Sequence, residues 1–183
     1  LMGENGAGKS TFMKILNGLL EPDEGSIEFA GQKVRIHSPS EALKLGIAMI
    51  YQDARLALNP VERVRAHFLE TLRFHKAGSE ESFERKSREL LSLLKFEDPE
   101  RVLDAYPFEL SGGMCQRVYI ALILCLEPEI LIADEPTSAL DPRARRRVIE
   151  TLRALSQPLI LTTHDLDMAL DVCSRAALLY DGA

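Results

Sequence analysis

A loop rich in glycine opens the chain and carries one lysine and two hydroxyl side chains, running as GENGAGKST. It matches the pattern G-x-x-x-x-G-K-[ST], in which glycines let successive backbone N–H groups turn inward around a phosphate. Lys9 is placed to reach the β- and γ-phosphates, and the Ser10 hydroxyl to coordinate Mg²⁺. A match at every fixed position argues against a chance glycine-rich turn. The predicted nucleotide-binding residues are Gly3, Glu4, Asn5, Gly6, Ala7, Gly8, Lys9, Ser10 and Thr11.

Two carboxylates follow the apolar run Ile130-Leu131-Ile132-Ala133. A buried strand of this kind delivers the side chains after it to the carboxyl edge of the sheet, where ligands bind in open α/β folds. Asp134 would hold Mg²⁺, directly or through water, and Glu135 would be the general base that polarises an attacking water. Two acids that merely cap a strand at the surface are the alternative. The phosphate loop weakens it, because loop and strand supply complementary halves of one magnesium-nucleotide site.

A second glycine pair stands in LSGGMCQR, from Leu110 to Arg117. Ser111 can cap the helix that follows, and Gly112 with Gly113 leaves its first amides uncovered, which makes a second anion-binding helix end. Taken alone, this motif is equally compatible with an ordinary serine-capped helix.

The elements that must position these residues alternate along the chain. Short strands are predicted at 26–29, 32–36, 130–133, 159–162 and 176–180, and a continuous apolar run at 47–51. A helix is predicted at 9–20 with Phe12, Ile15, Leu16 and Leu19 on one face. Residues 61–106 read as a helical subdomain, and Asp141 with Pro142 as the start of a further helix. The pattern predicts an α/β fold: a mostly parallel sheet flanked by helices, with a small antiparallel part and the inserted helical subdomain.

Composition narrows the class of function. The 183 residues have a formal net charge of −6, which argues against a nucleic-acid binder because phosphate contacts require a basic surface. No apolar run approaches the roughly 18 to 20 residues that span a bilayer. The three cysteines share no metal-ligand spacing, so we interpret Cys115 and Cys125 as small buried thiols in a reducing compartment.

Five motifs together resemble the ATP-binding cassette (ABC) ATPase family. They are GENGAGKST as Walker A, Gln52 in the Q-loop position, LSGGMCQR as the signature, ADEPTSALD as Walker B with the D-loop, and TTHDL around His164. Their order and spacing match the family over nearly the whole chain. The resemblance implies a P-loop NTPase core that hydrolyses ATP with Mg²⁺.

The resemblance also implies roles for residues that no local pattern assigns. Gln52 would contact Mg²⁺ and the attacking water, and His164 would contact the γ-phosphate. Two such domains pair head-to-tail, so that each ATP lies between one phosphate loop and the partner's signature. The residues implied for the partner's ATP are Ser111, Gly112, Gly113 and Gln116, and those for the D-loop are Ser138, Ala139, Leu140 and Asp141.

As an ABC ATPase, the chain is expected to power a prokaryotic importer from the cytoplasmic face of the cell membrane. Its partners would be a second ABC ATPase domain in a homo- or heterodimer, membrane-spanning permease subunits and an external substrate-binding protein. The middle of the chain is similar to dipeptide, oligopeptide and nickel importers, as in LNPV from Leu58, so a peptide or nickel cargo is favoured. The segment from Thr163 to Gly182 resembles cobalt-type ATPases at least as well. A soluble ABC ATPase that acts on ribosomes or DNA is the alternative.

The chain begins inside its first motif, because a phosphate loop normally follows a buried strand and only Leu1 and Met2 precede Gly3. The family's adenine-stacking aromatic residue also lies upstream of the loop. We therefore expect residues 1–183 to be one ABC ATPase domain that is incomplete at both ends, with weakened ATP binding in isolation.

Overall fold

The computed structural model describes residues 1–3, 6–75, 79–138 and 140–179. They divide into two compact units. The first unit combines Leu1–Met49, Pro128–Glu135 and Ser156–Ala183, and the second combines Ile50–Glu127 and Pro136–Leu155. Each unit holds its own set of the predicted functional residues.

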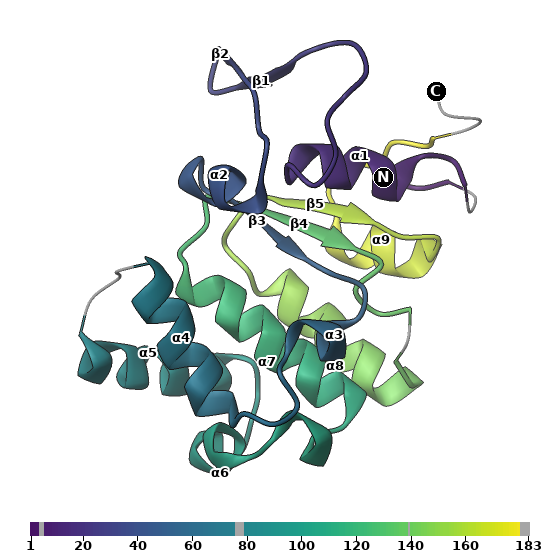
Figure 1. Ribbon diagram of the computed structural model, residues 1–183. Coiled ribbons are helices and arrows are strands. Elements are labelled where there is room, and N and C mark those ends of the chain that lie inside the picture. Colours follow the sequence, from purple (N-terminus) through teal and green to yellow (C-terminus); the bar gives the residue numbers. More distant parts are fainter. Residues whose placement is uncertain (4–5, 76–78, 139, 180–183) are drawn as a thin grey trace. The chain divides into compact units, whose positions relative to one another are not determined.

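A sheet in the order β3-β4-β5 forms the centre of the first unit, as Figure 1 shows. Its strands are β3 (Ile47–Ile50), β4 (Ile130–Asp134) and β5 (Leu159–Thr162). β4 and β5 are parallel, with Asp134 directly opposite Thr162. Apolar side chains on both faces of β4 are buried, which is the environment of a central parallel strand and explains its unbroken apolar run.

Helix α1 (Lys9–Leu16) starts at the end of the phosphate loop and is shorter than predicted. Gly18 has φ +69°, a left-handed conformation that stops helices and suits glycine. The predicted apolar face is also wrong: Phe12 is 43% exposed, whereas Lys9 and Met13 are buried. The loop turns Lys9 inward, and the residue one turn later must share its side of the helix. Helices α2 (Pro39–Lys44) and α9 (Leu166–Val172) complete the helices described for this unit.

An antiparallel hairpin, β1 (Ile27–Phe29) and β2 (Gln32–Val34), also belongs to the first unit. Its turn uses positive φ angles at Ala30 and Gly31, as a two-residue hairpin loop requires. The predicted second strand continued to Ile36, but the pairing ends at Val34 and Ile36 is buried beyond it.

The C-terminal part of the first unit differs from the predicted strand at 176–180. There the described residues show one parallel bridge, between Leu178 and Met2. Tyr180, and the closing turn assigned to Asp181 and Gly182, lie outside the described residues.

The second unit is helical. It contains α3 (Ala54–Ala57), α4 (Val64–His75), α5 (Glu80–Leu93), α6 (Pro99–Asp104), the 3₁₀ turn η1 (Pro107–Glu109), α7 (Gly112–Cys125) and α8 (Pro142–Arg153). Helices α3, α4, α5 and α8 contact α7, whose side chains are buried on nearly every face, as its apolar sequence predicts. The Arg65 guanidinium joins α4 to α5 and α6 through Glu84, Glu100 and Asp104, at 2.8–3.2 Å.

The predicted fold class, α/β with a small antiparallel part and an inserted helical region, is confirmed. Among the described helices, none is both long and apolar enough to cross a membrane. The boundaries predicted for the domain and for its helical subdomain stay predictions.

Candidate nucleotide-binding site

The phosphate loop leads directly into α1, which begins at Lys9. Gly6 and Gly8 have φ angles of +91° and +88°, so the loop turns through conformations that side chains disfavour. Lys9 is buried, and its ammonium donates a hydrogen bond of 2.6 Å to the Gly3 carbonyl. The lysine therefore folds back over the loop, where an anion bound to the backbone amides would meet its charge.

Asp134 ends β4 next to the start of α1. Its Oδ1 atom accepts hydrogen bonds from the Ser10 hydroxyl at 3.2 Å and from the Thr162 hydroxyl at 2.5 Å. The Ser10 bond joins the phosphate loop to the acidic strand end, 124 residues later in the sequence. The two halves predicted for a magnesium-nucleotide site are thus in contact within the first unit.

Hydroxyl and carboxylate oxygens suit Mg²⁺, which prefers hard oxygen ligands and takes few of them from the protein when it also binds phosphates. Ser10 and Asp134 bring such oxygens to one point at the end of the loop. The donor set therefore fits the predicted metal, and these two residues would hold it beside the nucleotide phosphates.

Glu135 follows Asp134 in a left-handed backbone conformation, with φ +46°. Its backbone N–H donates to the Thr162 carbonyl at 3.1 Å. Its carboxylate oxygen Oε2 lies 2.9 Å from Nδ1 of His164, and its side chain is mostly buried while the histidine is largely exposed. Two residues predicted separately as catalytic, 29 positions apart by their numbers, are therefore direct neighbours.

Helix α7 carries the LSGG motif at its start in the second unit. Ser111 caps it by accepting a hydrogen bond from the Met114 N–H, as predicted. Gly113 is buried against α8: a Cβ atom there would lie 2.4 Å from the Cβ of Ala144. Gln116 is buried and donates to the Tyr51 carbonyl at 3.2 Å, which fixes the segment just before Gln52.

Gln52 and the D-loop meet in the second unit. The Gln52 amide Nε2 donates to the Ser138 hydroxyl at 2.8 Å. Leu140 is half-buried, and Asp141 caps α8 by accepting from the Arg143 and Ala144 N–H groups at 3.0 Å. Asp141 thus has the capping role that the sequence predicts.

The predicted site residues accordingly form two groups. The first unit brings together the loop residues with Asp134, Glu135 and His164. The second unit brings Gln52 to Ser138 and places the LSGG residues at the start of α7. Glu4, Asn5 and Ala139, which were also predicted, lie outside the described residues.

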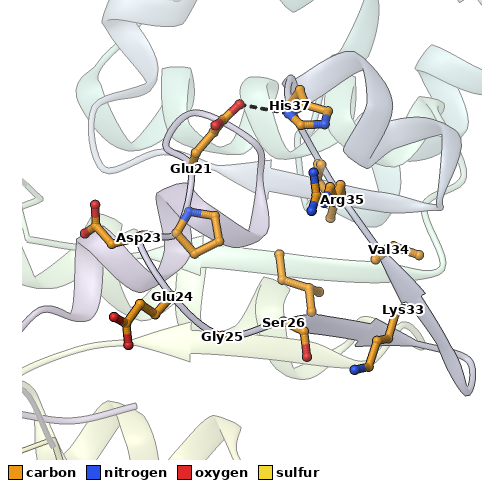
Figure 2. A pocket seen from close by; sticks show the side chains of 12 residues that line it. Glu21, Asp23, Glu24, Gly25, Ser26, Lys33, Val34, Arg35 and His37 are labelled. Carbon is orange, nitrogen blue, oxygen red and sulfur yellow. Dashed lines mark hydrogen bonds and ion pairs between the residues drawn. The ribbon is translucent and has the colours of Figure 1, made fainter.

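A cavity of about 560 Å³ lies beside the β1–β2 hairpin, away from this chemistry (Figure 2). Acidic residues from Glu21 to Glu24 face it, together with Lys33, Arg35 and His37, and His37 Nδ1 contacts the Glu21 carboxylate at 2.8 Å. None of the predicted site residues lines it. Because both side chains of the His37–Glu21 contact are mostly exposed, it contributes little to stability.

Two residues with structural consequences at the site escaped the sequence analysis. Thr162 contacts Asp134 because the parallel register places them opposite each other; in the sequence it ends an apolar strand and begins TTHDL, where only His164 was assigned a role. Arg117, the last residue of LSGGMCQR, is buried over the Phe96 ring at 4.1 Å and donates to the Leu94 carbonyl at 2.9 Å. Burial, and then the nearby Arg147 charge, lower the pKa of Arg117.

Comparisons with known proteins show which family the chain resembles in sequence and fold. The model of the ABC transporter family matches residues 1–138. The dipeptide transport ATP-binding protein DppD of Escherichia coli (strain K12) is 36% identical over 193 aligned positions, covering 100% of this chain and 59% of that protein.

Two solved structures are similar over 99% of the chain. One is cbiO1 from Clostridium perfringens, described as part of the ABC transporter complex cbiONQ, with a TM-score of 0.82, 29% identity and 72% of its own chain covered. The other is the ATP-binding cassette MJ0796 in a dimeric post-hydrolysis state with ADP and Pi, with a TM-score of 0.79, 29% identity and 80% covered.

A phosphate loop joined to an acidic strand end, and a serine-capped LSGG helix, define an ABC-type nucleotide-binding domain. The family match covers 138 of the 183 residues, so the chain belongs to the ABC transporter family. The family predicted from the five motifs is thereby confirmed. The chain spans about 59% of the length of the curated relative it matches.

Proposed function

We propose that this chain binds and hydrolyses ATP and thereby drives an ABC importer. The observation that carries the proposal is the joined cluster in the first unit, where Ser10 bonds Asp134 and Glu135 lies against His164. The family match and the MJ0796 structure, which holds ADP and Pi, support nucleotide hydrolysis by this arrangement.

In the proposed reaction the loop amides and Lys9 bind the β- and γ-phosphates, and Ser10 and Asp134 would hold Mg²⁺. For Gln52, a contact to the metal is implied by the family resemblance alone. The metal would neutralise charge that develops on the phosphates. Glu135 accepts the proton of the attacking water as general base. His164 contacts the γ-phosphate. Because its Nδ1 lies 2.9 Å from the Glu135 carboxylate, it also holds the general base in position.

A second ABC ATPase domain is the first partner that we propose. The LSGG helix of each domain would present its capped N-terminus to the ATP on the other domain's loop, because helix N-termini bind anions. Ser111 and Gly112 would form that face with Ser138, Leu140 and Asp141 of the D-loop, whereas Gly113 and Gln116 are buried and would support it from within the second unit. The dimeric state in which the similar MJ0796 structure was solved supports this assembly.

Membrane-spanning permease subunits are the second proposed partner, which would place the chain on the cytoplasmic face of the membrane. In the second unit, Leu56 and Val61 are 87% and 76% exposed, and Phe108 is 71% exposed. Large apolar side chains that stay exposed mark protein interfaces when they gather on one part of a molecule. Leu56 and Val61 follow Gln52 by four and nine residues, so a permease bound there would contact the segment directly after Gln52.

For the cargo we propose a peptide, supplied by an external substrate-binding protein. The relative DppD is a dipeptide transport protein, and its alignment covers the whole of this chain. The ATPase would not contact the peptide itself, so the proposal rests on this similarity.

Substitution of Glu135 by glutamine tests the catalytic assignment. The amide keeps the shape of the side chain but cannot accept a proton, so we expect ATP-dependent dimers that turn over about 10²–10³-fold more slowly. Turnover and dimerisation would be measured by phosphate release and by light scattering in the full-length protein. Glu150→Gln, on the exposed ion pair with Arg146, is the matched control and should retain full turnover. Unchanged turnover in Glu135→Gln would remove Glu135 from its role.

A further inference from the structure

Thr162, the first residue of TTHDL, was assigned no predicted role of its own, yet it joins the two acidic residues of the site. Thr162 ends β5 and is fully buried, opposite Asp134 in the parallel register. Its hydroxyl donates to Asp134 Oδ1 at 2.5 Å and accepts from the Glu135 N–H at 3.3 Å. One side chain therefore contacts the residue proposed for the metal and the residue proposed as general base.

The first of these contacts restricts the carboxylate of Asp134. With Ser10 and Thr162 both donating to Oδ1, this oxygen is fixed from two sides, and the carboxylate plane is set by two hydroxyls from different elements. Oδ2 lies outside these two bonds. Partners of this kind orient metal ligands, and their loss commonly costs metal affinity or activity 10–100-fold.

The second contact acts on the backbone of Glu135. Its φ of +46° is uncommon for a residue with a side chain and costs conformational energy unless the surroundings hold it. The Glu135 N–H lies 3.1 Å from the Thr162 carbonyl and 3.3 Å from the Thr162 hydroxyl, so Thr162 holds this amide with two acceptors. The left-handed turn is what directs the Glu135 carboxylate toward His164, at 2.9 Å.

We propose that Thr162 is a positioning residue for the hydrolytic reaction: its hydroxyl orients the Asp134 carboxylate for Mg²⁺ and helps to hold Glu135 in its left-handed conformation. This inference rests on the proposed ATP hydrolysis. A purely structural role, in which the hydroxyl only satisfies buried polar groups, would change the stability of the protein without a specific effect on metal binding.

Thr162→Val separates these roles, because valine keeps the branched shape and replaces the hydroxyl by a methyl group, which cannot form hydrogen bonds. We expect kcat to fall about 10–100-fold, with KM for ATP changed less than about threefold. The second readout is direct binding of Mn²⁺ in the presence of ADP, measured by electron paramagnetic resonance without turnover. Its dissociation constant should rise about tenfold or more.

Two further variants complete the experiment in the full-length protein. Thr162→Ser returns the hydroxyl and should restore Mn²⁺ binding and kcat to within about threefold of the unsubstituted protein. Thr151→Val makes the same change at another buried threonine, in α8, and should leave both quantities unchanged. Circular dichroism melting checks that each variant is folded; if Thr162→Val does not fold, Thr162→Ala is compared with Thr162→Ser instead.

The inference is overturned if Thr162→Val or Thr162→Ala keeps normal kcat and Mn²⁺ binding, or if the serine variant is as impaired as the valine variant. Both results are judged by comparison with the unsubstituted protein, which must itself hydrolyse ATP. An unsubstituted protein without ATP hydrolysis would instead refute the proposed function, so the two failures are distinguishable.

Discussion

At the scale of single residues, the site depends on an unfavourable backbone conformation and on a buried charged side chain, both of which the surrounding structure must stabilise. Glu135 has a positive φ angle, and Lys9 is buried with its ammonium turned back onto the Gly3 carbonyl. Strained and buried polar residues of this kind cluster where a protein binds or reacts, because the surrounding contacts must hold them. Sequence spacing predicted both residues, but it could not predict the backbone that directs them.

The three cysteines lead to a prediction about pH. Burial raises the pKa of Cys125 to about 12, against 9.0 for a free thiol, and it also raises the pKa of Cys115. Between pH 9 and 12 the unfolded chain loses this proton while the native state keeps it, so native stability must fall as the pH rises.

We expect the free energy of unfolding to decrease across this range by at most about 1.4 kcal/mol per pH unit for Cys125. Urea denaturation at several pH values measures the slope, and Cys125→Ala should reduce it. An equal slope in Cys125→Ala would contradict the assignment.

In thiol labelling at pH 8, the half-buried Cys173 should react before Cys115 and Cys125.

At the scale of elements, α7 must meet two requirements, one at its first turn and one along the rest of the helix. Under the proposed function its first turn would present backbone amides to an anion, while the rest of the helix is buried against α3, α4, α5 and α8. At Gly113 the absence of a Cβ lets α8 approach closely, because a Cβ there would lie 2.4 Å from the Ala144 Cβ. The apolar sequence of α7 predicted its burial, whereas the close approach to Ala144 depends on packing between distant segments.

The adjacent glycines at the start of α7 should respond differently to substitution. A Cβ at Gly113 would lie 2.4 Å from the Ala144 Cβ, so Gly113→Ala forces α7 and α8 apart, and we expect a loss of about 1–3 kcal/mol of stability. At Gly112 the nearest atom would be 3.7 Å away, an ordinary contact. Gly112→Ala should therefore be neutral or stabilise the helix by up to about 1 kcal/mol. Urea denaturation compares the two, and equal losses would refute the packing argument.

At the scale of the whole molecule, the proposed function requires two further surfaces besides the nucleotide site. One is the LSGG face, which would complete a site on a second ATPase domain. The other is the surface around the exposed side chains of Leu56 and Val61, which would contact a permease. The two surfaces can be tested separately. The LSGG face would bind the second ATPase domain only in the presence of ATP, whereas the permease surface is defined by apolar side chains.

Paired substitution of Leu56 and Val61 by serine tests the permease surface. We expect the double variant to lose co-purification with the membrane subunits by about tenfold or more, since exposed apolar anchors dominate such interfaces. ATP-dependent dimerisation should be unchanged, as neither side chain belongs to the nucleotide site. Leu170→Ser, at a leucine of α9 that is 71% exposed, is the matched control and should still co-purify. Normal co-purification of the double variant would exclude this surface.

The sequence alone determined the features that depend on neighbouring residues. The glycines and Lys9 of the phosphate loop, the capping by Ser111 and Asp141, and the apolar run of β4 all arise from local chemistry, so motif and periodicity predicted them. Tertiary structure decided what distant segments do to one another. Strand register placed Thr162 against Asp134, and the inward turn of Lys9 set the rotation of α1, leaving Phe12 exposed. These contacts depend on how elements pack and pair, which no local pattern in the chain encodes.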